Sequence, residues 1–118
     1  MNSLHARTVF FVTNAGAALE FYTSALGFSR DWVHEEAERP FVGQVSRHGF
    51  ELIINQIDDT TTHRVGTGRV FIGLDEEQVQ AFHDHLASNN IETATVQWGR
   101  PTVVIADMDG NELYFWKP

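Results

Sequence analysis

A change from helical to strand periodicity occurs within the stretch Glu20-Phe21-Tyr22-Thr23-Ser24-Ala25-Leu26-Gly27-Phe28-Ser29-Arg30-Asp31-Trp32-Val33. Before Gly27, apolar residues recur at helical spacing, and after Gly27, apolar and polar residues alternate as in a strand. Glycine takes the left-handed conformation that ends a helix without the steric penalty of a Cβ atom. The stretch therefore predicts a helix that ends at Leu26-Gly27 and a strand over residues 29–34.

The residues on either side complete a first module. Residues 7–13 are β-branched and aromatic, which predicts an opening strand, and Asn14 is suited to cap the helix that follows. The apolar face of that helix is made by Ala18, Leu19, Tyr22, Ala25 and Leu26. The acidic run Glu35-Glu36-Ala37-Glu38, up to Pro40, predicts a loop. Two more strands are predicted over residues 41–47 and 50–56, with a turn at His48-Gly49 between them.

After a polar linker the same order of elements returns. Asp75 and Gln78 match a capping box, and Asp109-Gly110 predicts a tight type I′ hairpin. The apolar face of the second helix is made by Val79, Phe82 and Leu86. The other predicted elements are strands over residues 69–74, 91–97, 102–106 and 112–116. We therefore expect a single domain over 1–118, with one module over about 5–57, a linker over 58–68 and a second module over about 69–118.

The repeated order β-α-β-β-β predicts an α+β fold of two βαβββ modules whose curved sheets surround a cleft. In the two closing strands, Leu52 and Ile54, and likewise Leu113 and Phe115, are placed to pack on a helix. The alternate residues face the other way: Glu51, Ile53, Asn55, Glu112, Tyr114 and Trp116. The cleft is therefore predicted to be aromatic and partly acidic.

Composition narrows the possible functions. The chain has 118 residues, no cysteine and a formal net charge of −8. The acidic balance argues against nucleic acid or an anionic membrane as partner, because both need a basic footprint, and it is compatible with a cationic ligand. The absence of cysteine excludes disulfides and zinc-thiolate sites. No apolar run has transmembrane length and no signal-peptide pattern opens the chain, so we expect a soluble cytoplasmic protein.

Two sets of motifs give the chain a family resemblance. Phe21-Tyr22 with Leu26-Gly27-Phe28 near the start, and Asp107-Met108-Asp109-Gly110-Asn111-Glu112-Leu113 near the end, resemble the vicinal oxygen chelate superfamily of glyoxalases, extradiol dioxygenases and bleomycin-resistance proteins. Glu20-Phe21-Tyr22-Thr23, the run 26–33 with its acidic continuation, and Trp98-Gly99-Arg100 resemble the bleomycin-resistance proteins more closely. The resemblance covers essentially the whole chain.

The resemblance also locates the superfamily metal site. Its enzymes hold a divalent metal with His and Glu from the opening and last strands of each module. The corresponding positions here are Arg7, Glu51, Arg69 and Tyr114. Only Glu51 is a competent ligand, because a guanidinium repels a cation and does not deprotonate to bind it. We therefore predict no metal and no cofactor, and an ion-pair set of Arg7, Glu51 and Arg69 in place of the metal. A two-residue shift in register would bring His5 to the same face of the strand.

The resemblance implies metal-independent binding and sequestration of a bleomycin-type glycopeptide antibiotic. Such a drug carries a flat bithiazole and a positive tail, which aromatic planes and carboxylates would bind. Phe41 and Trp98 occupy the stacking positions, and the acidic loop supplies negative charge. The predicted ligand-binding residues are Asp31, Trp32, Glu35, Glu36, Phe41, Ile53, Asn55, Trp98, Gly99, Arg100 and Tyr114. The structural alternative is that the two stacking aromatics belong to the core and that the acidic run is a solvated loop.

Two further functions stay open at this point. The first is a metal-dependent enzyme of the superfamily, a lyase, dioxygenase or thiol transferase, which would need a ligand set other than the four positions above. The histidines at hand are His34, His48 and His63 on a strand, a turn and the linker, and His83 and His85 on different helix faces, both expected to face solvent. The second is a metal-free binder of another small molecule. The resemblance also implies a homodimer with ligand sites at the subunit interface and an N-terminal strand available for exchange.

Overall fold

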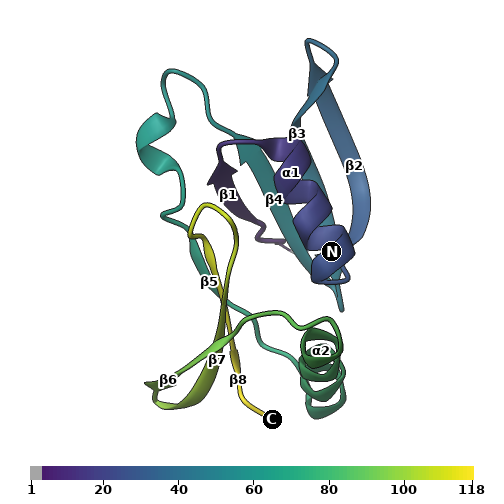
Figure 1. Cartoon of the computed structure of the whole chain (residues 1–118), viewed down its shortest axis with the longest axis vertical. Coiled ribbons are helices and arrows are strands. Elements are labelled where there is room, and N and C mark those ends of the chain that lie inside the picture. The colour runs from purple at the N-terminus through teal and green to yellow at the C-terminus, as the bar shows by residue number, and fades with distance from the viewer. Residues whose placement is uncertain (1–3) are drawn as a thin grey trace.

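The computed structural model describes residues 4–118, which form two modules joined by a polar connection (Figure 1). The first module contains β1 (Thr8–Val12), α1 (Ala15–Glu20), β2 (Ser29–Glu36), β3 (Arg39–Arg47) and β4 (Phe50–Gln56). The second contains β5 (Arg69–Phe71), α2 (Glu76–Ser88), β6 (Ala94–Trp98), β7 (Arg100–Ala106) and β8 (Glu112–Trp116). A π-helical turn, Phe21–Ala25, continues α1, and a short 3-10 helix, Thr62–Arg64, lies in the connection.

Each module builds its own four-stranded mixed sheet. The strand orders are β1-β4-β3-β2 and β5-β8-β7-β6, so the same topology occurs twice. In each sheet the opening and closing strands are parallel, and the remaining neighbours are antiparallel. This arrangement confirms the predicted α+β fold of two βαβββ modules. No helix within residues 4–118 has the length and apolar character needed to cross a membrane.

The core lies between the helices and one face of each sheet. The predicted alternation holds in both closing strands, because Leu52, Ile54, Leu113 and Phe115 are all essentially buried. The predicted face of the first helix is buried at Ala18, Leu19, Tyr22 and Leu26, while Ala25 remains partly exposed. In α2, Phe82 and Leu86 are buried and Val79 packs against the same core.

The predicted helix stop is realised at Gly27, which has a φ of 76°. The backbone N–H of Phe28 donates to Tyr22 O at 2.9 Å as the chain turns out of the helix. Two side chains from elsewhere in the fold bind the last carbonyls: Arg47 Nη1 donates to Gly27 O at 2.8 Å, and His85 Nε2 lies 3.0 Å from Ala25 O. The expectation that His85 faces solvent is therefore wrong, because its ring satisfies a helix-end carbonyl of the other module.

The acidic run after Trp32 is mostly strand, so its prediction as a loop is wrong. Strand β2 continues through Glu36, and only Ala37 and Glu38, with φ values of 51° and 62°, form the turn. Backbone pairing with β3 places Glu36 opposite Arg39. Cross-strand pairing of opposite charges stabilises a strand there despite the acidic composition.

The turn predicted between the last two strands also differs. Strands β7 and β8 do form a hairpin, but Gly110 has a positive φ of 98° and Asp109 does not, so the turn is not type I′. The carboxylate of Asp107 instead accepts the backbone N–H groups of Asp109 and Asn111, at 2.9 and 3.0 Å. This side-chain-to-backbone bonding supports a longer loop over residues 107–111.

Candidate functional site

The open face of the second sheet carries four aromatic side chains, Phe71, Trp98, Tyr114 and Trp116, which we call the aromatic row. They come from β5, β6 and β8. All of them lie toward the end of the sheet at which β5 and β8 end. Leu113 and Phe115 alternate with them in sequence and are buried in the core, so Tyr114 and Trp116 point to the opposite face. Because β5 pairs in parallel with β8, Phe71 lies directly beside Tyr114.

The rings of the aromatic row are in continuous contact. The ring centroid of Phe71 is 5.4 Å from that of Trp98 and 5.2 Å from that of Trp116, and Trp98 is 5.7 Å from Tyr114. These separations are in the range of favourable aromatic pairs. The two tryptophans nevertheless remain about half exposed, Trp98 at 51% and Trp116 at 46%. The row is therefore a preassembled apolar surface that is open to a planar ligand.

An arginine side chain lies over the aromatic ring at each end of the row. Arg69 Cζ lies 5.3 Å from the centroid of Tyr114, and Arg100 Cζ lies 4.6 Å from that of Trp116. Arg69 Nε is also 3.6 Å from Glu112 Oε1. Guanidinium groups stacked on aromatic faces hold those rings in place and leave the middle of the row for a ligand.

Two shallow cavities open onto the row. One of about 310 Å³ is bounded by Arg69, Val70, Phe71, Trp98 and Tyr114. The other, of about 470 Å³, is bounded by Phe71, Trp98, Gly99 and Trp116. Gly99, with a φ of 77°, makes the tight turn between Trp98 at the end of β6 and Arg100 at the start of β7. Apart from its chain neighbours, a Cβ atom at Gly99 would have no heavy atom within 4 Å, so the space beside this turn is open.

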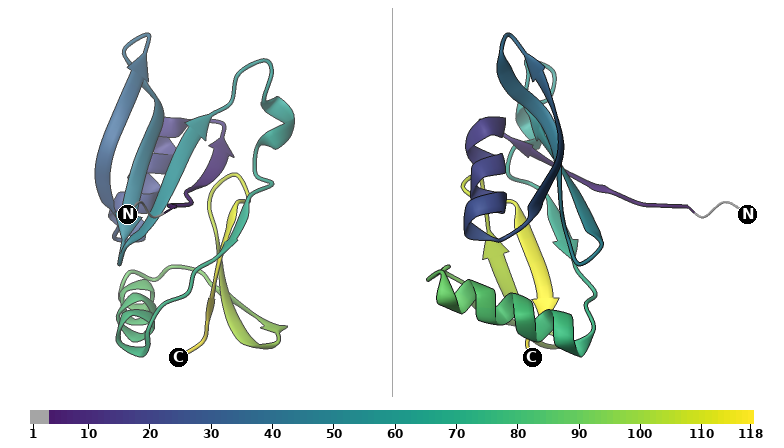
Figure 2. Two further views of the ribbon diagram at one scale, coloured as in Figure 1. Left: turned by 180° about the vertical axis from the view of Figure 1, so that it is seen from behind. Right: turned by 90° about the vertical axis from the view of Figure 1, so that its right-hand side faces the viewer.

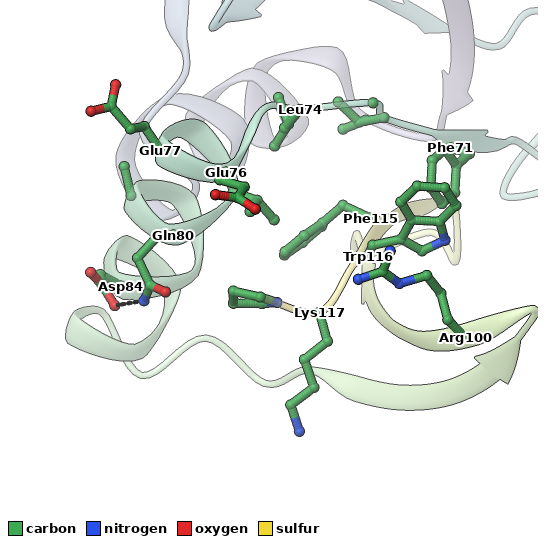
Figure 3. Close-up of a pocket in the computed structure, with 15 residues that line it drawn as sticks. Phe71, Leu74, Glu76, Glu77, Gln80, Asp84, Arg100, Phe115, Trp116 and Lys117 are labelled. Carbon is green, nitrogen blue, oxygen red and sulfur yellow. Dashed lines mark hydrogen bonds between the residues drawn. The ribbon is translucent and has the colours of Figure 1, made fainter.

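A larger hollow lies beside the row, between α2 and the end of β8 (Figure 3). Its volume is about 860 Å³, and we call it the α2 cavity. Phe71 and Trp116 of the row, and Arg100 above Trp116, also line this cavity. The wall of this cavity also includes Gly73, Glu76, Asp84 and Phe115.

Four of the predicted site residues thus come together in the second module: Trp98, Gly99, Arg100 and Tyr114. The sequence did not indicate Phe71 as a site residue, gave Arg69 only as a position of the superfamily metal site, and placed Trp116 in the cleft without naming it as a ligand residue. The sequence predicted a strand at Phe71, but the parallel pairing of β5 with β8 that sets Phe71 beside Tyr114 appears only in the structure.

Other predicted site residues lie on the open face of the first sheet. Trp32, Gln44 and Ile53 are register partners across β2, β3 and β4, and Trp32 is 44% exposed. Asp31 is the extra residue of a bulge ahead of Trp32, and its carboxylate accepts from Gln44 Nε2 and Ser46 Oγ, both at 2.9 Å. Asn55 donates to Gln56 O at 2.8 Å. This face is polar and acidic where the other sheet is aromatic.

Within one chain, Glu35, Glu36 and Phe41 are not brought to the aromatic row. Both glutamates lie near the hairpin end of β2, the outer strand of the first sheet, and Glu36 Oε2 is 3.5 Å from His34 Nε2. Phe41 is the extra residue of a second irregularity, in β3, and is partly buried. None of the close aromatic pairs found in residues 4–118 includes it.

The predicted metal positions hold ion pairs, but in a different grouping. Arg7 Nε donates to Glu51 Oε1 at 3.2 Å, whereas Arg69 lies opposite Glu112 in the register. The expected set of Arg7, Glu51 and Arg69 is therefore wrong: each module pairs its own arginine with its own glutamate. A guanidinium beside each carboxylate is unsuited to hold a divalent cation.

The remaining donors do not supply another metal site. Among the described residues, no three side chains of His, Asp or Glu lie close enough together to hold a metal ion. His5 lies in the exposed segment ahead of β1. The residues present therefore do not fit the metal of the superfamily enzymes.

Comparison with known proteins places this geometry in a family. Residues 5–115 match the family model described as Glyoxalase/Bleomycin resistance protein/Dioxygenase superfamily. No curated protein matches the sequence.

Solved structures share the fold at low identity. A bleomycin-binding protein from Streptomyces verticillus, complexed with copper(II)-bleomycin, superposes with a TM-score of 0.74 at 18% identity, covering 100% of this chain and 98% of the other. An antibiotic-binding protein from Streptomyces sp. CB03234 gives 0.64 at 21%, covering 100% and 99%. A lactoylglutathione lyase from Agrobacterium tumefaciens gives 0.66 at 18%, covering 97% and 92%. The chain belongs to the glyoxalase/bleomycin resistance protein/dioxygenase superfamily.

Proposed function

We propose that the chain binds and sequesters an antibiotic of the bleomycin type, without a metal of its own. The observation that carries this proposal is the aromatic row: four contacting rings, two of them half exposed, with an arginine closing each end. A flat heteroaromatic system such as a bithiazole can stack on Trp98 and Phe71 without any prior rearrangement of the site. A preformed surface lowers the ordering cost of binding.

Charge supports the same ligand class. The chain carries a net charge of −8, which favours the approach of a cationic drug. On the first sheet, the carboxylates of Asp31 and Glu51 are both within hydrogen-bond distance of Gln44 Nε2, which is part of a residue only 5% exposed. This fixed acidic network lies on the open face of that sheet, where it can meet a polar part of a ligand.

Two relatives of the same fold add weight to antibiotic binding, one crystallised with copper(II)-bleomycin and one described as antibiotic-binding. The fold also carries a lactoylglutathione lyase, so fold alone does not choose between binder and enzyme. The choice comes from the site. By the resemblance, Arg7 and Arg69 correspond to positions where the enzymes of the superfamily hold a metal, and their pairing with Glu51 and Glu112 favours a binder over a metalloenzyme.

We also propose that the chain acts as a homodimer. The open faces of both sheets expose large apolar side chains, including Val9 at 42%, Trp32 at 44% and Trp116 at 46%. A second copy with its acidic first sheet facing the aromatic second sheet would cover these surfaces and bring Trp32 and Asp31 toward the row. Sedimentation velocity should then give about twice the chain mass of 13.4 kDa. A species of single-chain mass with full drug affinity would contradict this part of the proposal.

The function is tested by protection of DNA. Sequestration predicts that plasmid cleavage by iron-bleomycin stops when one protein chain is present for each drug molecule, and that less protein gives proportionally less protection. Denaturing the protein afterwards should release active drug. Protection by far less than one chain per drug molecule, with the drug recovered in altered form, would instead show an enzyme that modifies it.

A further inference from the structure

The α2 cavity is a second recess that none of the predicted site residues except Arg100 reaches. At about 860 Å³ it is larger than either hollow over the aromatic row, and one wall is helix α2. Its floor and far wall are apolar, with Phe115, Leu74 and Trp116 among them (Figure 3). Cavities of this size suit a substantial part of a drug-sized molecule.

The cavity continues from the aromatic row. Phe71 and Trp116 line it and belong to the row, where Trp116 contacts Phe71 edge to face and lies beneath the Arg100 guanidinium, which also lines the cavity. A ring stacked on Trp98 and Phe71 would therefore have its next substituent at the mouth of the α2 cavity. This continuity makes the two recesses parts of a single binding surface.

The helix wall of the cavity is acidic. Glu76 projects from the first turn of α2 toward Phe115, and Asp84 lies two turns further along the helix (Figure 3). Asp84 Oδ1 accepts from Gln80 Nε2 at 2.9 Å. Among residues 4–118, no Lys, Arg or His nitrogen lies within 4.0 Å of either carboxylate. The opposite wall has two basic side chains, Arg100 and Lys117. Arg100 stacks on Trp116, and Lys117 extends away from the hollow.

We infer that the α2 cavity binds the cationic tail of the ligand whose planar ring stacks on the aromatic row. This inference rests on the proposed function and changes where the positive charge is bound: α2 supplies the carboxylates, in the same chain as the row. The apolar floor accepts the alkyl part of the tail, and Glu76 and Asp84 bind its charged end. The ligand class is thus a planar heteroaromatic joined by a flexible arm to an amine or sulfonium.

Calorimetric titration with two probes tests this inference: metal-free bleomycin, and bleomycinic acid, the same drug without its cationic terminal amine. Glu76→Gln and Asp84→Asn should each weaken bleomycin binding about two- to fivefold, the range of a partly exposed charge pair. Neither substitution should weaken the binding of bleomycinic acid. Glu92→Gln is the matched control, because it removes one carboxylate from an exposed position outside the cavity and should leave both affinities unchanged.

A steric variant makes the test independent of charge. A Cβ atom at Gly73, which lines the cavity, would have no heavy atom within 4 Å, so Gly73→Leu can fill the space without a clash at its first carbon. It should weaken bleomycin but not bleomycinic acid, with an unchanged circular dichroism spectrum.

The outcomes separate the two proposals. If Trp98→Ala weakens both probes while Glu76→Gln, Asp84→Asn and Gly73→Leu change neither, the ligand uses the row and the inference about the cavity is wrong. Equal affinity of the unmodified protein for bleomycin and bleomycinic acid would also overturn the inference that the cavity binds the cationic tail. If neither probe binds the unmodified protein, the proposed function fails and this inference fails with it.

Discussion

The hydroxyl of Tyr22 donates a hydrogen bond of 2.9 Å to Asp107 Oδ2, and it joins the two modules through their buried interior. Tyr22 is 1% exposed and Asp107 is 8% exposed. The same carboxylate accepts from Asn111 Nδ2 at 3.0 Å, and Asn111 in turn donates to Phe11 O of the first module at 3.1 Å. The loop between β7 and β8 therefore fixes the first helix and the first strand relative to the second sheet (Figure 2).

Tyr22→Phe should lower the free energy of unfolding by about 1–3 kcal/mol, because it removes one buried donor from a carboxylate that stays in place. The ring contacts with Phe21 and Phe28 remain. Urea denaturation measures the change. Tyr114→Phe is the matched control: its hydroxyl donates to Glu112 Oε1 in a partly exposed setting, and its loss should cost less. Equal effects of the two substitutions would argue against a buried junction at Tyr22.

The same contact predicts how stability responds to alkali. Burial, and then the nearby charge of Asp107, raise the pKa of Tyr22 well above its ordinary value of 10.0. In the unfolded chain the phenol loses its proton near pH 10, whereas in the folded protein it stays protonated to higher pH. The contribution of Tyr22 to stability is therefore complete below pH 10 and is lost as the pH rises above it. Urea midpoints measured from pH 8 to 11 should fall more steeply for the unmodified protein than for Tyr22→Phe, and parallel curves would contradict this.

Gly27→Ala should destabilise the fold more than Gly49→Ala. Both glycines have a left-handed φ, 76° and 84°, so each alanine costs about 1–2 kcal/mol of backbone strain. At Gly27 the new Cβ would also lie 2.6 Å from Arg47 Nη1 and 2.8 Å from the His85 ring, whereas at Gly49 it would meet nothing within 4 Å. Overpacking of this kind adds about 1–3 kcal/mol. Thermal denaturation of both variants measures the two losses of stability. A similar loss of stability at the two sites would mean that the helix end is loosely packed.

Trp98→Ala should weaken drug binding by about 1 kcal/mol or more, close to fivefold in affinity, because one stacking plane is lost. The fold should persist, since half of the indole is exposed. Met108→Ala provides the comparison, because Met108 is a similarly exposed apolar side chain, at 60%, in the loop between β7 and β8. Calorimetry of both variants is the measurement. An unchanged affinity in Trp98→Ala would remove this residue from the site.

The features that the sequence predicted well depend on interactions between residues close together in the chain. The helix end at Gly27 follows from a conformation that glycine adopts readily, and the buried faces of β4 and β8 follow from the period of two in a strand. The capping box at Asp75 and Gln78 is present as predicted. Each of these depends on residues only a few positions apart.

The candidate site was predicted less completely because it depends on register between distant strands. Phe71 and Trp98 lie 27 positions apart in the printed sequence, and only the order β5-β8-β7-β6 brings their strands into one sheet. The pairing of Arg69 with Glu112 likewise depends on a parallel register that the sequence does not display. His85 was misplaced for the same reason, since its partner, Ala25 O, belongs to the other module.

Isothermal titration of the chelator-treated protein with metal-free bleomycin measures whether the aromatic row binds a planar drug without metal. We predict one binding site per chain, with a dissociation constant of about 1 μM or tighter, corresponding to roughly −8 kcal/mol. When the protein is first incubated with nickel, zinc, manganese or iron, its affinity for the drug should stay unchanged in the same titration. Absence of binding to the chelated protein, or binding that appears only after the protein is loaded with metal, would contradict this prediction.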